Sequence, residues 1–406
     1  MSAHANPDIV DDGLVFLYDT DDGKSYKGEP TENIFLNPTF IGTAGTQTST
    51  VTDNWYFSGY TGDSGFKFYN NSTSPFSLKF PNEGSLITTG ANDDSTTQNR
   101  RFYCDEVLQA GATYTVSAWI YTTRTSGLSI AHFEYGGSSL NSGYFSGTST
   151  HPNHVLGEWY YWEDTYTVGA DYTSGLIGPV HTGSSDTIVG IQRFQIEKKS
   201  HATPFVNGTR SATQGLLDRT GTSTINISNA SFDSNAQMTF DGTDDYIEVP
   251  NTNLPAPSTN LTMECVFQRD SGRTIINYGP SGFNTSKNYG FECLGSNPAL
   301  RSNINTSSGS TQIIGTTVIN SNTKYYGAMT YDGSSVKLYV NGKLEASASK
   351  SGSILNSSTP SLNIGRKNSG NGEYINGEIP IVRIYNRALT AAEVLQNYNA
   401  IKSRFQ

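Results

Sequence analysis

The chain has 406 residues, and its 24 tyrosines and 19 phenylalanines far outnumber its 4 methionines. Aromatic bulk among many Gly, Ser, Thr and Asn residues favours strands and turns, so the composition excludes a mainly helical protein. The formal net charge is -10, and no Lys/Arg cluster could neutralise a row of phosphates, so we expect no nucleic-acid partner.

The sequence contains no recognisable export or membrane signal. No run approaches the roughly 18 apolar residues that cross a bilayer, and residues 1–12 lack a basic segment followed by an apolar one. Cys104, Cys265 and Cys293 are an odd number in a long chain, so we expect free buried thiols rather than disulfides. The sequence therefore predicts synthesis in a cytoplasm without a signal peptide and without membrane insertion.

Alternating apolar and polar residues, the pattern of half-buried strands, recur along the whole chain. The clearest predicted strands are residues 66–69, 114–120, 159–167, 188–197 and 336–340. Segments rich in Gly, Ser and Asn separate them, which is typical of antiparallel sandwiches and barrels.

One helix is predicted, at the end of the chain. Residues 391–401 follow Thr390, which can cap them in a capping box. Val394, Leu395 and Tyr398 would share one face of this helix, so we expect the helix to dock on a sheet through them.

Six blocks in the second half of the chain occur in the order and spacing of one known family. They are 238–249 (MTFDGTDDYIEV), 261–267 (LTMECVF), 325–333 (YYGAMTYDG), 336–343 (VKLYVNGK), 362–366 (LNIGR) and 377–390 (GEIPIVRIYNRALT). Together they resemble the laminin-G-like, concanavalin A-type jelly roll, over about residues 209–398. The resemblance implies two antiparallel sheets with apolar residues between them, and Asn341-Gly342 as a tight hairpin turn that needs positive φ.

Another block lies near the start of the chain. Residues 13–19 (GLVFLYD) and 24–26 (KSY) resemble the first strand of the same family as found in bacteriophage virion proteins, where a segment like 216–221 (LLDRTG) soon follows. Here residues 27–215 intervene. We predict an insertion, because lengthening an exposed loop adds little closure entropy. An N-terminal arm unrelated to the later domain is the alternative.

Four segments of the predicted insert resemble a carbohydrate-binding-module jelly roll of the kind attached to bacterial glycanases: 33–40 (NIFLNPTF), 55–57 (WYF), 108–120 (LQAGATYTVSAWI) and 193–197 (RFQIE). The expected fold class is therefore all-β, with two antiparallel jelly-roll domains, one inserted into the other, and a short C-terminal helix. The predicted divisions are an N-terminal arm with the first strand (1–33), the inserted sandwich (34–200) and the laminin-G-like domain (201–406).

Aromatic side chains are the candidates for a ligand site, because their rings stack on the apolar faces of sugars. In Trp159-Tyr160-Tyr161-Trp162, successive side chains of a strand point to opposite faces, so one pair faces outward. The alternative for each ring is packing in the core or against another subunit.

Two further rings, Trp55 and Tyr56, are candidates for the same reason and carry the same alternative. Trp119 stands inside a regular predicted strand, and we expect it in the core.

The acidic turn of Asp241, Asp244 and Asp245 offers the hard oxygen ligands that Ca²⁺ takes from a loop. The laminin-G-like resemblance implies Ca²⁺ near this turn, although Pro380 stands where many relatives have an acidic residue. A solvated turn whose aspartates cap local amides is the alternative. Calcium is the one cofactor that we expect.

A glycosidase needs two carboxyl groups roughly 5–10 Å apart around the sugar bond. Glu158 and Glu163 are the nearest candidates, and their spacing of five puts them on opposite faces of a regular strand. No nucleophile elbow, zinc-protease motif or paired Cys-x-x-Cys is present. We therefore predict a protein without enzymatic activity.

The predicted function is that of an exterior virion protein of a tailed phage, a capsid decoration or a fibre-like appendage, that binds host-surface glycans. Other virion proteins are the expected partners, and homo-oligomeric assembly is expected because such assemblies normally close about rotation axes. A purely architectural capsid protein without ligand and a polysaccharide depolymerase are the two alternatives.

Overall fold

The computed structural model of the chain divides into two compact units. We call residues 1–30 with 211–406 the C-terminal unit, and residues 31–210 the inserted unit. The predicted divisions, after residues 33 and 200, lie near these boundaries. The structure describes residues 8–35, 39–40, 55–58, 67–89, 100–109, 111–123, 128–135, 138–145, 155–167, 172–181, 188–233, 237–250, 258–279, 289–295, 298–355, 361–367 and 373–405.

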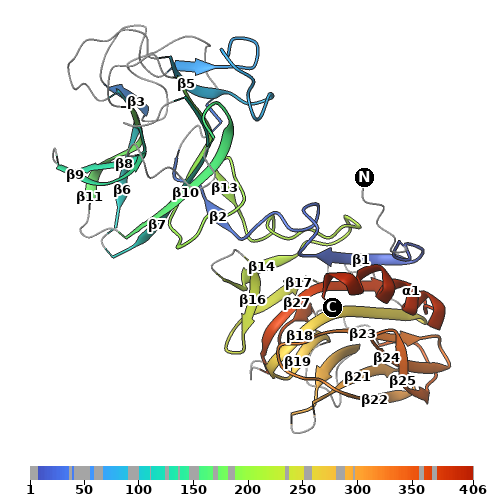
Figure 1. Cartoon of the computed structure of the whole chain (residues 1–406). Helices are drawn as coiled ribbons and strands as arrows, with labels where there is room; N and C mark the ends of the chain where they lie inside the picture. Colours follow the sequence, from blue (N-terminus) through green and yellow to red (C-terminus); the bar gives the residue numbers. More distant parts are fainter. Residues whose placement is uncertain are drawn as a thin grey trace. The chain divides into compact units, whose positions relative to one another are not determined.

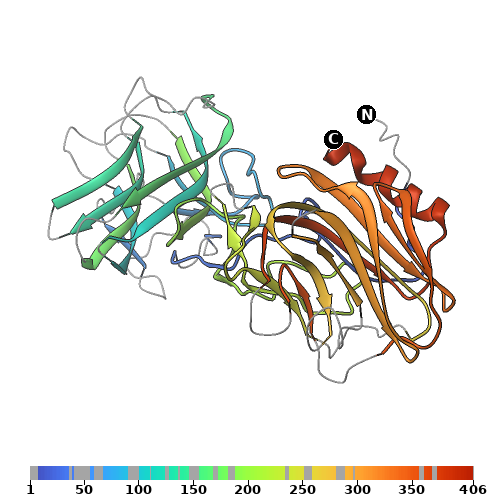
Figure 2. The same cartoon turned by 90° about the horizontal axis from the view of Figure 1, so that it is seen from below.

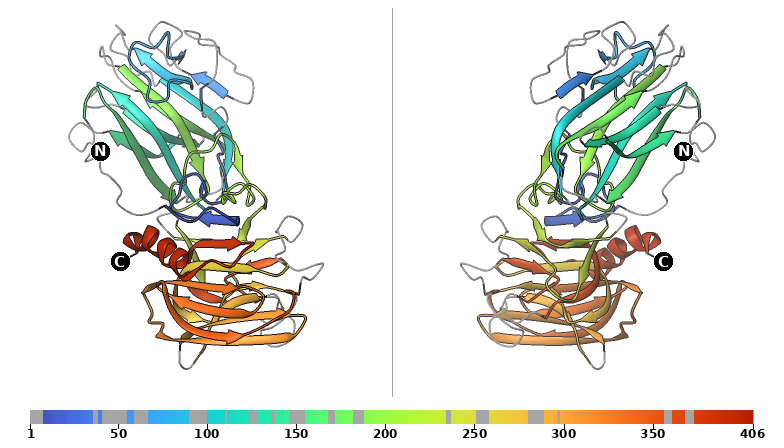
Figure 3. Two further views of the ribbon diagram at one scale, coloured as in Figure 1. Left: turned by 90° about the vertical axis from the view of Figure 1, so that its right-hand side faces the viewer. Right: turned by 90° about the vertical axis from the view of Figure 1, so that its left-hand side faces the viewer.

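Two antiparallel sheets form the C-terminal unit (Figure 1, Figure 3). Within the described ranges, the first sheet runs in the order β15 (Ser231–Phe232), β16 (Met238–Asp241), β27 (Ile375–Tyr385), β18 (Leu261–Gly272), β23 (Lys324–Tyr331), β24 (Ser335–Val340) and β25 (Lys343–Ser349). The second runs in the order β14 (Asn226–Asn229), β17 (Tyr246–Val249), β26 (Leu362–Ile364), β19 (Thr274–Tyr278), β20 (Tyr289–Cys293), β21 (Ala299–Thr306) and β22 (Gly309–Val318).

The first strand of the chain joins the first of these sheets. β1 (Leu14–Asp19) pairs antiparallel with β27, with Phe16 opposite Ile384 and Tyr18 opposite Val382. The side chains of Phe16 and Tyr18 are fully buried in the same core as strands from residues 211–406. The inserted unit therefore interrupts a sheet that the two ends of the chain build together.

Every second side chain of the strands fills the space between the two sheets of the C-terminal unit. In β18, Met263, Cys265 and Phe267 face the inter-sheet core, and Val266 faces the opposite side with the C-terminal helix. Successive strand residues point to opposite faces, so a single strand serves both layers.

The predicted hairpin turn is confirmed at the end of β24. Asn341 has φ +48° and Gly342 has φ +76°, the paired positive values of a type I′ turn. The turn connects β24 to β25, which pair antiparallel.

The C-terminal helix α1 (Ala391–Ile401), followed by a 3-10 turn (Lys402–Arg404), starts where the sequence predicts. The Thr390 side chain accepts from the backbone of Glu393, and the Glu393 carboxylate accepts from the backbone of Thr390, which completes the capping box. Among the described residues, no helix combines the length and apolarity that crossing a bilayer requires.

The residues through which α1 docks on the sheet differ from those predicted. Val394, Asn397 and Ile401 are its buried residues, whereas Leu395 is 46% exposed. The prediction that the helix docks on a sheet is confirmed, and the assignment of Leu395 to the docked face is wrong. The buried positions repeat at i, i+3 and i+7, which places Leu395 about 100° around the helix from Val394.

The inserted unit also consists of two antiparallel sheets (Figure 2). Within the described ranges, one runs in the order β10 (Trp159–Thr167), β7 (Thr113–Thr122), β12 (Ile188–Glu197), β5 (Ser85–Thr89) and β4 (Lys67–Tyr69). The other runs in the order β3 (Trp55–Ser58), β6 (Arg100–Leu108), β11 (Tyr172–His181), β8 (Leu128–Tyr135) and β9 (Ser138–Phe145). The predicted all-β fold class is confirmed.

The two ends of the inserted unit meet in a short ladder. β2 (Thr31–Glu32) pairs antiparallel with β13 (Thr209–Arg210), with Thr31 opposite Arg210. The chain therefore enters and leaves this unit at adjacent positions, which is the geometry that domain insertion requires.

The thiols of the C-terminal unit are free and buried, as predicted for Cys265 and Cys293. Burial raises the pKa of Cys293 to about 12 and raises the pKa of Cys265 well above its ordinary value. The reactive thiolate is therefore scarce at neutral pH. The side chain of Cys104 lies outside the described residues.

We expect Cys265 and Cys293 to resist a water-soluble disulfide reagent in the folded protein and to react once it is denatured. The measurement is thiol titration of the Cys104→Ser variant, which leaves only the two buried thiols. Rapid native reaction of either thiol would contradict the buried arrangement.

Candidate functional site

The aromatic run of β10 splits between the two faces of its sheet. Tyr160 and Trp162 are 6% and 7% exposed and belong to the core of the inserted unit. Tyr161 is 39% exposed and Trp159 is half-buried, and both face outward. Tyr160 and Trp162 therefore do not belong to an outward ligand surface, because alternation directs them into the sandwich.

The adjacent strand β7 adds two more outward rings. Tyr161 lies opposite Trp119 and Trp159 lies opposite Tyr121 in the β10–β7 register. The ring centroids are 5.7 Å apart in each of these two pairs. We call Trp119, Tyr121, Trp159 and Tyr161 the aromatic surface.

The expectation that Trp119 lies in the core is wrong. Its neighbours Ala118 and Ile120 are fully buried in the core of the inserted unit, so the residue between them points outward. Trp119 is half-buried, because Phe80 contacts its ring edge-on at a centroid separation of 5.9 Å.

Part of the aromatic surface is covered by the segment 74–84. Phe76 stacks on Tyr121 with a centroid separation of 4.0 Å and an interplanar angle of 9°. Gly190 makes room for this ring, since a Cβ there would lie 2.5 Å from Phe76. The Trp159 indole N–H donates to the Ser77 carbonyl at 2.8 Å. Trp159 and Tyr121 are thereby fixed in place and partly shielded.

A buried glutamine holds this segment on the sheet. The Gln192 Nε2 donates to the carbonyls of Phe80 and Gly84 at 3.1 Å, and its Oε1 accepts from the Phe80 amide at 3.1 Å. Arg193 lies over the Phe80 ring at 3.5 Å and bonds Glu83 through two nitrogens. These contacts therefore hold the segment 74–84 in place beside Trp119.

Polar groups surround the exposed rings. The Lys79 ammonium lies 4.3 Å above the centre of the Trp119 ring. The Tyr161 hydroxyl is hydrogen-bonded with Ser117 and Glu163, and burial is the main reason why its pKa is raised. The phenol therefore stays neutral at physiological pH and can both donate and accept hydrogen bonds.

Sequence reasoning missed the residues that come from segment 74–84. Lys79 and Phe80 stand in a turn-rich stretch without alternation, so no periodic signal placed them beside Trp119. For Trp55 and Tyr56 the structure describes only the backbone of β3, and their side chains lie outside the described residues.

The two carboxylates considered for glycoside hydrolysis occupy different positions relative to β10. Glu163 lies on β10 and Glu158 precedes that strand, and both are exposed. Four residue steps of extended chain separate Trp159 from Glu163, which is about 13 Å.

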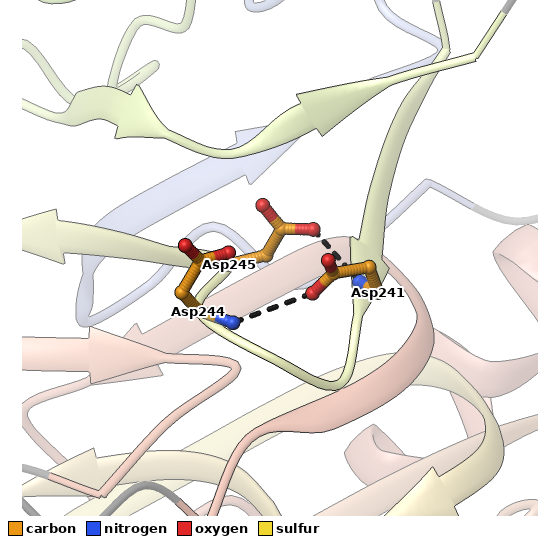
Figure 4. Close-up of side chains that lie close together, drawn as sticks. All are labelled: Asp241, Asp244 and Asp245. Carbon is orange, nitrogen blue, oxygen red and sulfur yellow. Dashed lines mark hydrogen bonds between the residues drawn. The ribbon is translucent and has the colours of Figure 1, made fainter.

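The second candidate is the acidic loop between β16 and β17, which comprises Asp241, Asp244 and Asp245 (Figure 4). Ligand atoms of the three carboxylates lie within 4.8 Å of one another. Asp241 Oδ1 accepts from the Thr243 amide at 2.7 Å and from the Asp244 amide at 3.4 Å. The structure therefore brings together the three residues that the sequence singled out.

The pKa values of Asp245 and Asp241 in this loop are shifted in opposite directions. Asp245 is 4% exposed, and burial is the main cause that raises its pKa. The hydrogen bond from the backbone amide of Thr243 is the main cause that lowers the pKa of Asp241. A cation bound between them would stabilise the charged form of Asp245.

The β16–β27 pairing places Asn376, rather than Pro380, beside the acidic loop. Asn376 lies opposite Asp241 in the register, and its Cβ would lie 3.1 Å from a Cβ on Gly242. An amide oxygen is a hard ligand, so Asn376 is a further candidate to complete a calcium shell.

Residues 241–395 match the model of a laminin G-like family described as the concanavalin A-like lectin/glucanases superfamily. This segment is a domain of that superfamily. The superfamily domain starts in the acidic loop and ends within α1. The inserted unit and β1 lie outside the matched segment.

No curated protein matches the chain. Solved structures that resemble parts of it include a sialidase of Trypanosoma rangeli, with 17% identity, a TM-score of 0.36, and coverage of 46% of this chain and 31% of the sialidase. Domain 4 of the arabinanase AbnA from Geobacillus stearothermophilus, in complex with arabinotriose, has 20% identity, a TM-score of 0.32, and coverage of 44% and 82%. The CBM40 of Ruminococcus gnavus IT-sialidase, bound to α2,3-sialyllactose, has 13% identity, a TM-score of 0.30, and coverage of 34% and 81%.

The chain covers 31% of that sialidase and 49% of the binding domain of a Paraclostridial mosquitocidal protein, less than two thirds of each.

Proposed function

We propose that this chain is a non-enzymatic protein of the exterior of a tailed-phage virion that binds glycans of the host surface. The observation that carries the glycan part is the outward pair Trp119 and Tyr161, with Lys79 and Glu163 beside it. The resemblance of residues 13–19 and of the laminin-G-like blocks to phage virion proteins supports the location.

The chemistry of the aromatic surface suits a sugar ring. The exposed face of Tyr161 and the half-buried Trp119 offer apolar area for the C–H face of a pyranose. Lys79 and Glu163 offer a donor and an acceptor at the rim for hydroxyl groups. Each site of this kind binds weakly, and many copies on one particle raise the overall avidity.

Tyr161→Ala and Trp119→Ala are each expected to weaken glycan binding about tenfold, a loss of about 1.4 kcal/mol, because each removes a ring on which the sugar would stack. The measurement is a glycan array followed by titration calorimetry with the best ligand. The matched control is Tyr161→Phe, which keeps the ring and should retain most of the binding.

Unchanged binding by both alanine variants would contradict a ligand site on this surface. Equal losses in Tyr161→Ala and Tyr161→Phe would assign the effect to the hydroxyl instead of the ring.

An architectural role is the second candidate, and two exposed apolar residues favour it. Val155 and Leu156, just before β10, are 61% and 48% exposed. In that case the residues around β10 would lie in contacts with other copies or other virion proteins. Particles that lose heat stability without this protein, and a protein that binds no glycan, would establish this function in place of the first.

A depolymerase would need two convergent acids, and the spacing of five between Glu158 and Glu163 does not place them on one face of a regular strand. We expect no release of reducing ends from host polysaccharide. Release that is lost on Glu163→Gln would overturn the non-enzymatic proposal.

We further propose that the acidic loop binds Ca²⁺. The three clustered carboxylates and the neighbouring Asn376 provide oxygen ligands, and a cation would offset their mutual repulsion. Ca²⁺ at a hundredfold excess over its Kd should stabilise the C-terminal unit by about 2.7 kcal/mol.

The measurement is the melting temperature with Ca²⁺, with Mg²⁺ and with chelator, for the wild type and for Asp244→Asn. Asp244 is exposed, so its replacement should abolish the Ca²⁺ effect without unfolding the apo protein. A Ca²⁺ effect that survives in Asp244→Asn, or none in the wild type, would contradict the site.

A further inference from the structure

The side chain of Lys350 lies at one end of the sandwich in the C-terminal unit. Lys350 directly follows β25, the last strand of the first sheet within the described ranges, and its backbone amide donates to the Ser334 carbonyl at 2.9 Å. Ala346 and Ala348 of β25 pack against the inter-sheet core. Since strand side chains alternate, Lys350 points to the same side, between the two sheets.

The second sheet approaches Lys350 at the start of β22. β22 lies beside β25 (Figure 1), and the Glu345 carboxylate joins the two strands by accepting from the backbone amides of Thr316 at 2.8 Å and Thr317 at 3.0 Å. A Cβ added to Gly309, the first residue of β22, would lie 3.9 Å from the Lys350 Nζ. The ammonium therefore reaches from the edge of one sheet to the edge of the other.

The Lys350 ammonium has no partner within the described residues. Only 8% of Lys350 is exposed, and burial is what lowers its pKa, with no carboxylate acting against it. Asp332, in the neighbouring turn before β24, accepts instead from the backbone amides of Ser334 and Ser335. Lysine is almost never buried unless it is paired, so this ammonium calls for a counter-charge from outside the chain.

The surroundings of the ammonium are open to solvent. Ser307, Ser308, Gly309 and Ser351 are all exposed. Apart from its chain neighbours, no other described atom comes within 4 Å of the Cβ position of Gly309 besides the Lys350 Nζ. A small ion can therefore reach the ammonium from the side of this glycine.

The chain that follows β25 has used its acceptors and kept donors free. The Ser351 carbonyl accepts from the hydroxyls of Thr306 at 2.6 Å and Ser308 at 2.5 Å. The Gly352 carbonyl accepts from the Tyr331 hydroxyl at 2.5 Å. Within the described part of the chain, no hydrogen bond uses the backbone amides of Ser351 and Gly352. Free amides next to an unpaired cation are suited to an anion.

A serine hydroxyl adds a further donor at the same place. Ser307 Oγ accepts from the Ser353 amide at 3.1 Å, which leaves its own proton available to donate. A Cβ on Gly352 would lie 2.6 Å from this Oγ. The hydroxyl therefore lies against the segment that carries the free amides.

These groups favour one class of ligand. The ammonium would repel a metal ion, and a neutral ligand would leave its charge uncompensated. An ammonium, backbone amides and a hydroxyl are the donors that bind phosphate in loops. A tetrahedral oxyanion also offers more acceptor oxygens than a carboxylate, which matches a site with several donors.

We propose that Lys350, with the backbone amides of the two residues after it, binds a tetrahedral oxyanion of the phosphate class. The Ser307 hydroxyl is the further donor. Because the ion would lie between the edges of the two sheets, its binding should stabilise the C-terminal unit. This proposal depends neither on the aromatic surface nor on Ca²⁺ in the acidic loop.

The test follows thermal unfolding of the full chain in phosphate, sulfate, acetate or chloride at equal ionic strength, with chelator present to keep the acidic loop free of metal. Tryptophan fluorescence reports the inserted unit, which contains all four tryptophans, and far-UV circular dichroism reports both units. General salt effects act on both units. Phosphate and sulfate are expected to raise the transition of the C-terminal unit by more than that of the inserted unit.

Lys350→Met keeps the apolar stem of the side chain and removes its charge. It should abolish the excess shift, with a loss of about tenfold or more in the apparent affinity for phosphate. In chloride this variant should be at least as stable as the wild type, because an unpaired charge has been removed. Lys343→Met, at an exposed position of β25, is the matched control and should keep the excess shift.

Methyl phosphate in a parallel series distinguishes the free ion from a phosphate group on a larger molecule: a shift equal to that in phosphate means that the site also accepts the esterified group. No excess shift in phosphate or sulfate, an excess shift that survives Lys350→Met, or an equal effect of acetate would each overturn the proposal. Lower stability of Lys350→Met in chloride would also overturn it, since the ammonium would then serve the fold and not a ligand.

Discussion

Glu264→Ala should lower the free energy of unfolding of the C-terminal unit by about 3–5 kcal/mol, the loss typical of removing one partner of a buried ion pair. The side chains of Glu264 and Arg383 are 1% and 2% exposed, and they pair at 3.3 Å under α1. Removal of the carboxylate leaves the Arg383 guanidinium buried without its counter-charge. It also removes the acceptor of the Tyr326 hydroxyl, at 2.6 Å, and of the Asn397 amide, at 3.0 Å.

The measurement must distinguish the two units. All four tryptophans, at positions 55, 119, 159 and 162, belong to the inserted unit. Tryptophan fluorescence therefore follows only the inserted unit during denaturation, while far-UV circular dichroism follows both. We expect Glu264→Ala to shift the dichroism transition and to leave the fluorescence transition in place.

The control for this prediction removes both charges together. Glu264→Leu combined with Arg383→Leu should recover most of the lost stability, because apolar replacements of a buried pair are often neutral or better. A double variant as unstable as Glu264→Ala would show that packing, and not the orphaned charge, causes the loss.

The pH dependence provides a second check on Glu264. Burial is the main cause that raises its pKa, against the opposing effect of Arg383. A raised carboxyl pKa contributes stability that is present below the ordinary value of about 4.3 and is lost as pH rises through the folded-state pKa. The free energy of unfolding of the wild type should therefore fall relative to that of Glu264→Gln as pH rises through that range.

Local signals in the sequence account for the parts of the fold that were predicted well. Thr390 defines the start of α1 because its side chain caps the first turn, and Asn341-Gly342 defines a hairpin because both residues adopt positive φ. The bounds of β10 and β12 agree with the alternating segments 159–167 and 188–197, although the register of β12 shifts between Gln192 and Gln195. Each of these signals is contained within a few residues.

The orientation of side chains was harder to predict, because alternation gives two faces without saying which is inward. The alternation of β7 groups Trp119 with Thr115 and Ser117, but a large apolar ring is also typical of a core, and the prediction followed the ring. The answer depends on the neighbouring strands, which direct Ala118 and Ile120 inward. Leu395 shows the same limit on a helix, because Asn397 and not an apolar residue completes the buried face.

Candidate sites were predictable only where their residues are close in sequence. Asp241, Asp244 and Asp245 fall within five positions, and the structure brings them together. Lys79 reaches Trp119 and Asn376 reaches Asp241 through sheet pairing and loop packing across long stretches of chain.

The inserted unit has its own buried carboxylate, and Glu197→Ala should destabilise that unit by about 3 kcal/mol or more, since hydrogen bonds to a charged group contribute roughly 1.5–3 kcal/mol each. Glu197 is fully buried. It accepts from the Thr31 hydroxyl at 2.5 Å, the Gln195 amide at 2.7 Å, and the Thr203 backbone and hydroxyl at 2.9 and 2.6 Å. The Glu197 side chain on β12 thus binds both Thr31, in the segment that enters the inserted unit, and Thr203, in the segment that leaves it.

Because the tryptophans report only the inserted unit, Glu197→Ala should move the fluorescence transition to lower denaturant, the converse of Glu264→Ala. Glu197→Gln keeps the volume and one acceptor oxygen, and should cost less than Glu197→Ala. If Glu197→Ala left the fluorescence transition in place, the carboxylate would not be what holds the two segments together. If Glu197→Ala and Glu264→Ala each shifted both transitions equally, the units would unfold as one cooperative body, and the independence that an insertion between two self-contained cores implies would be wrong.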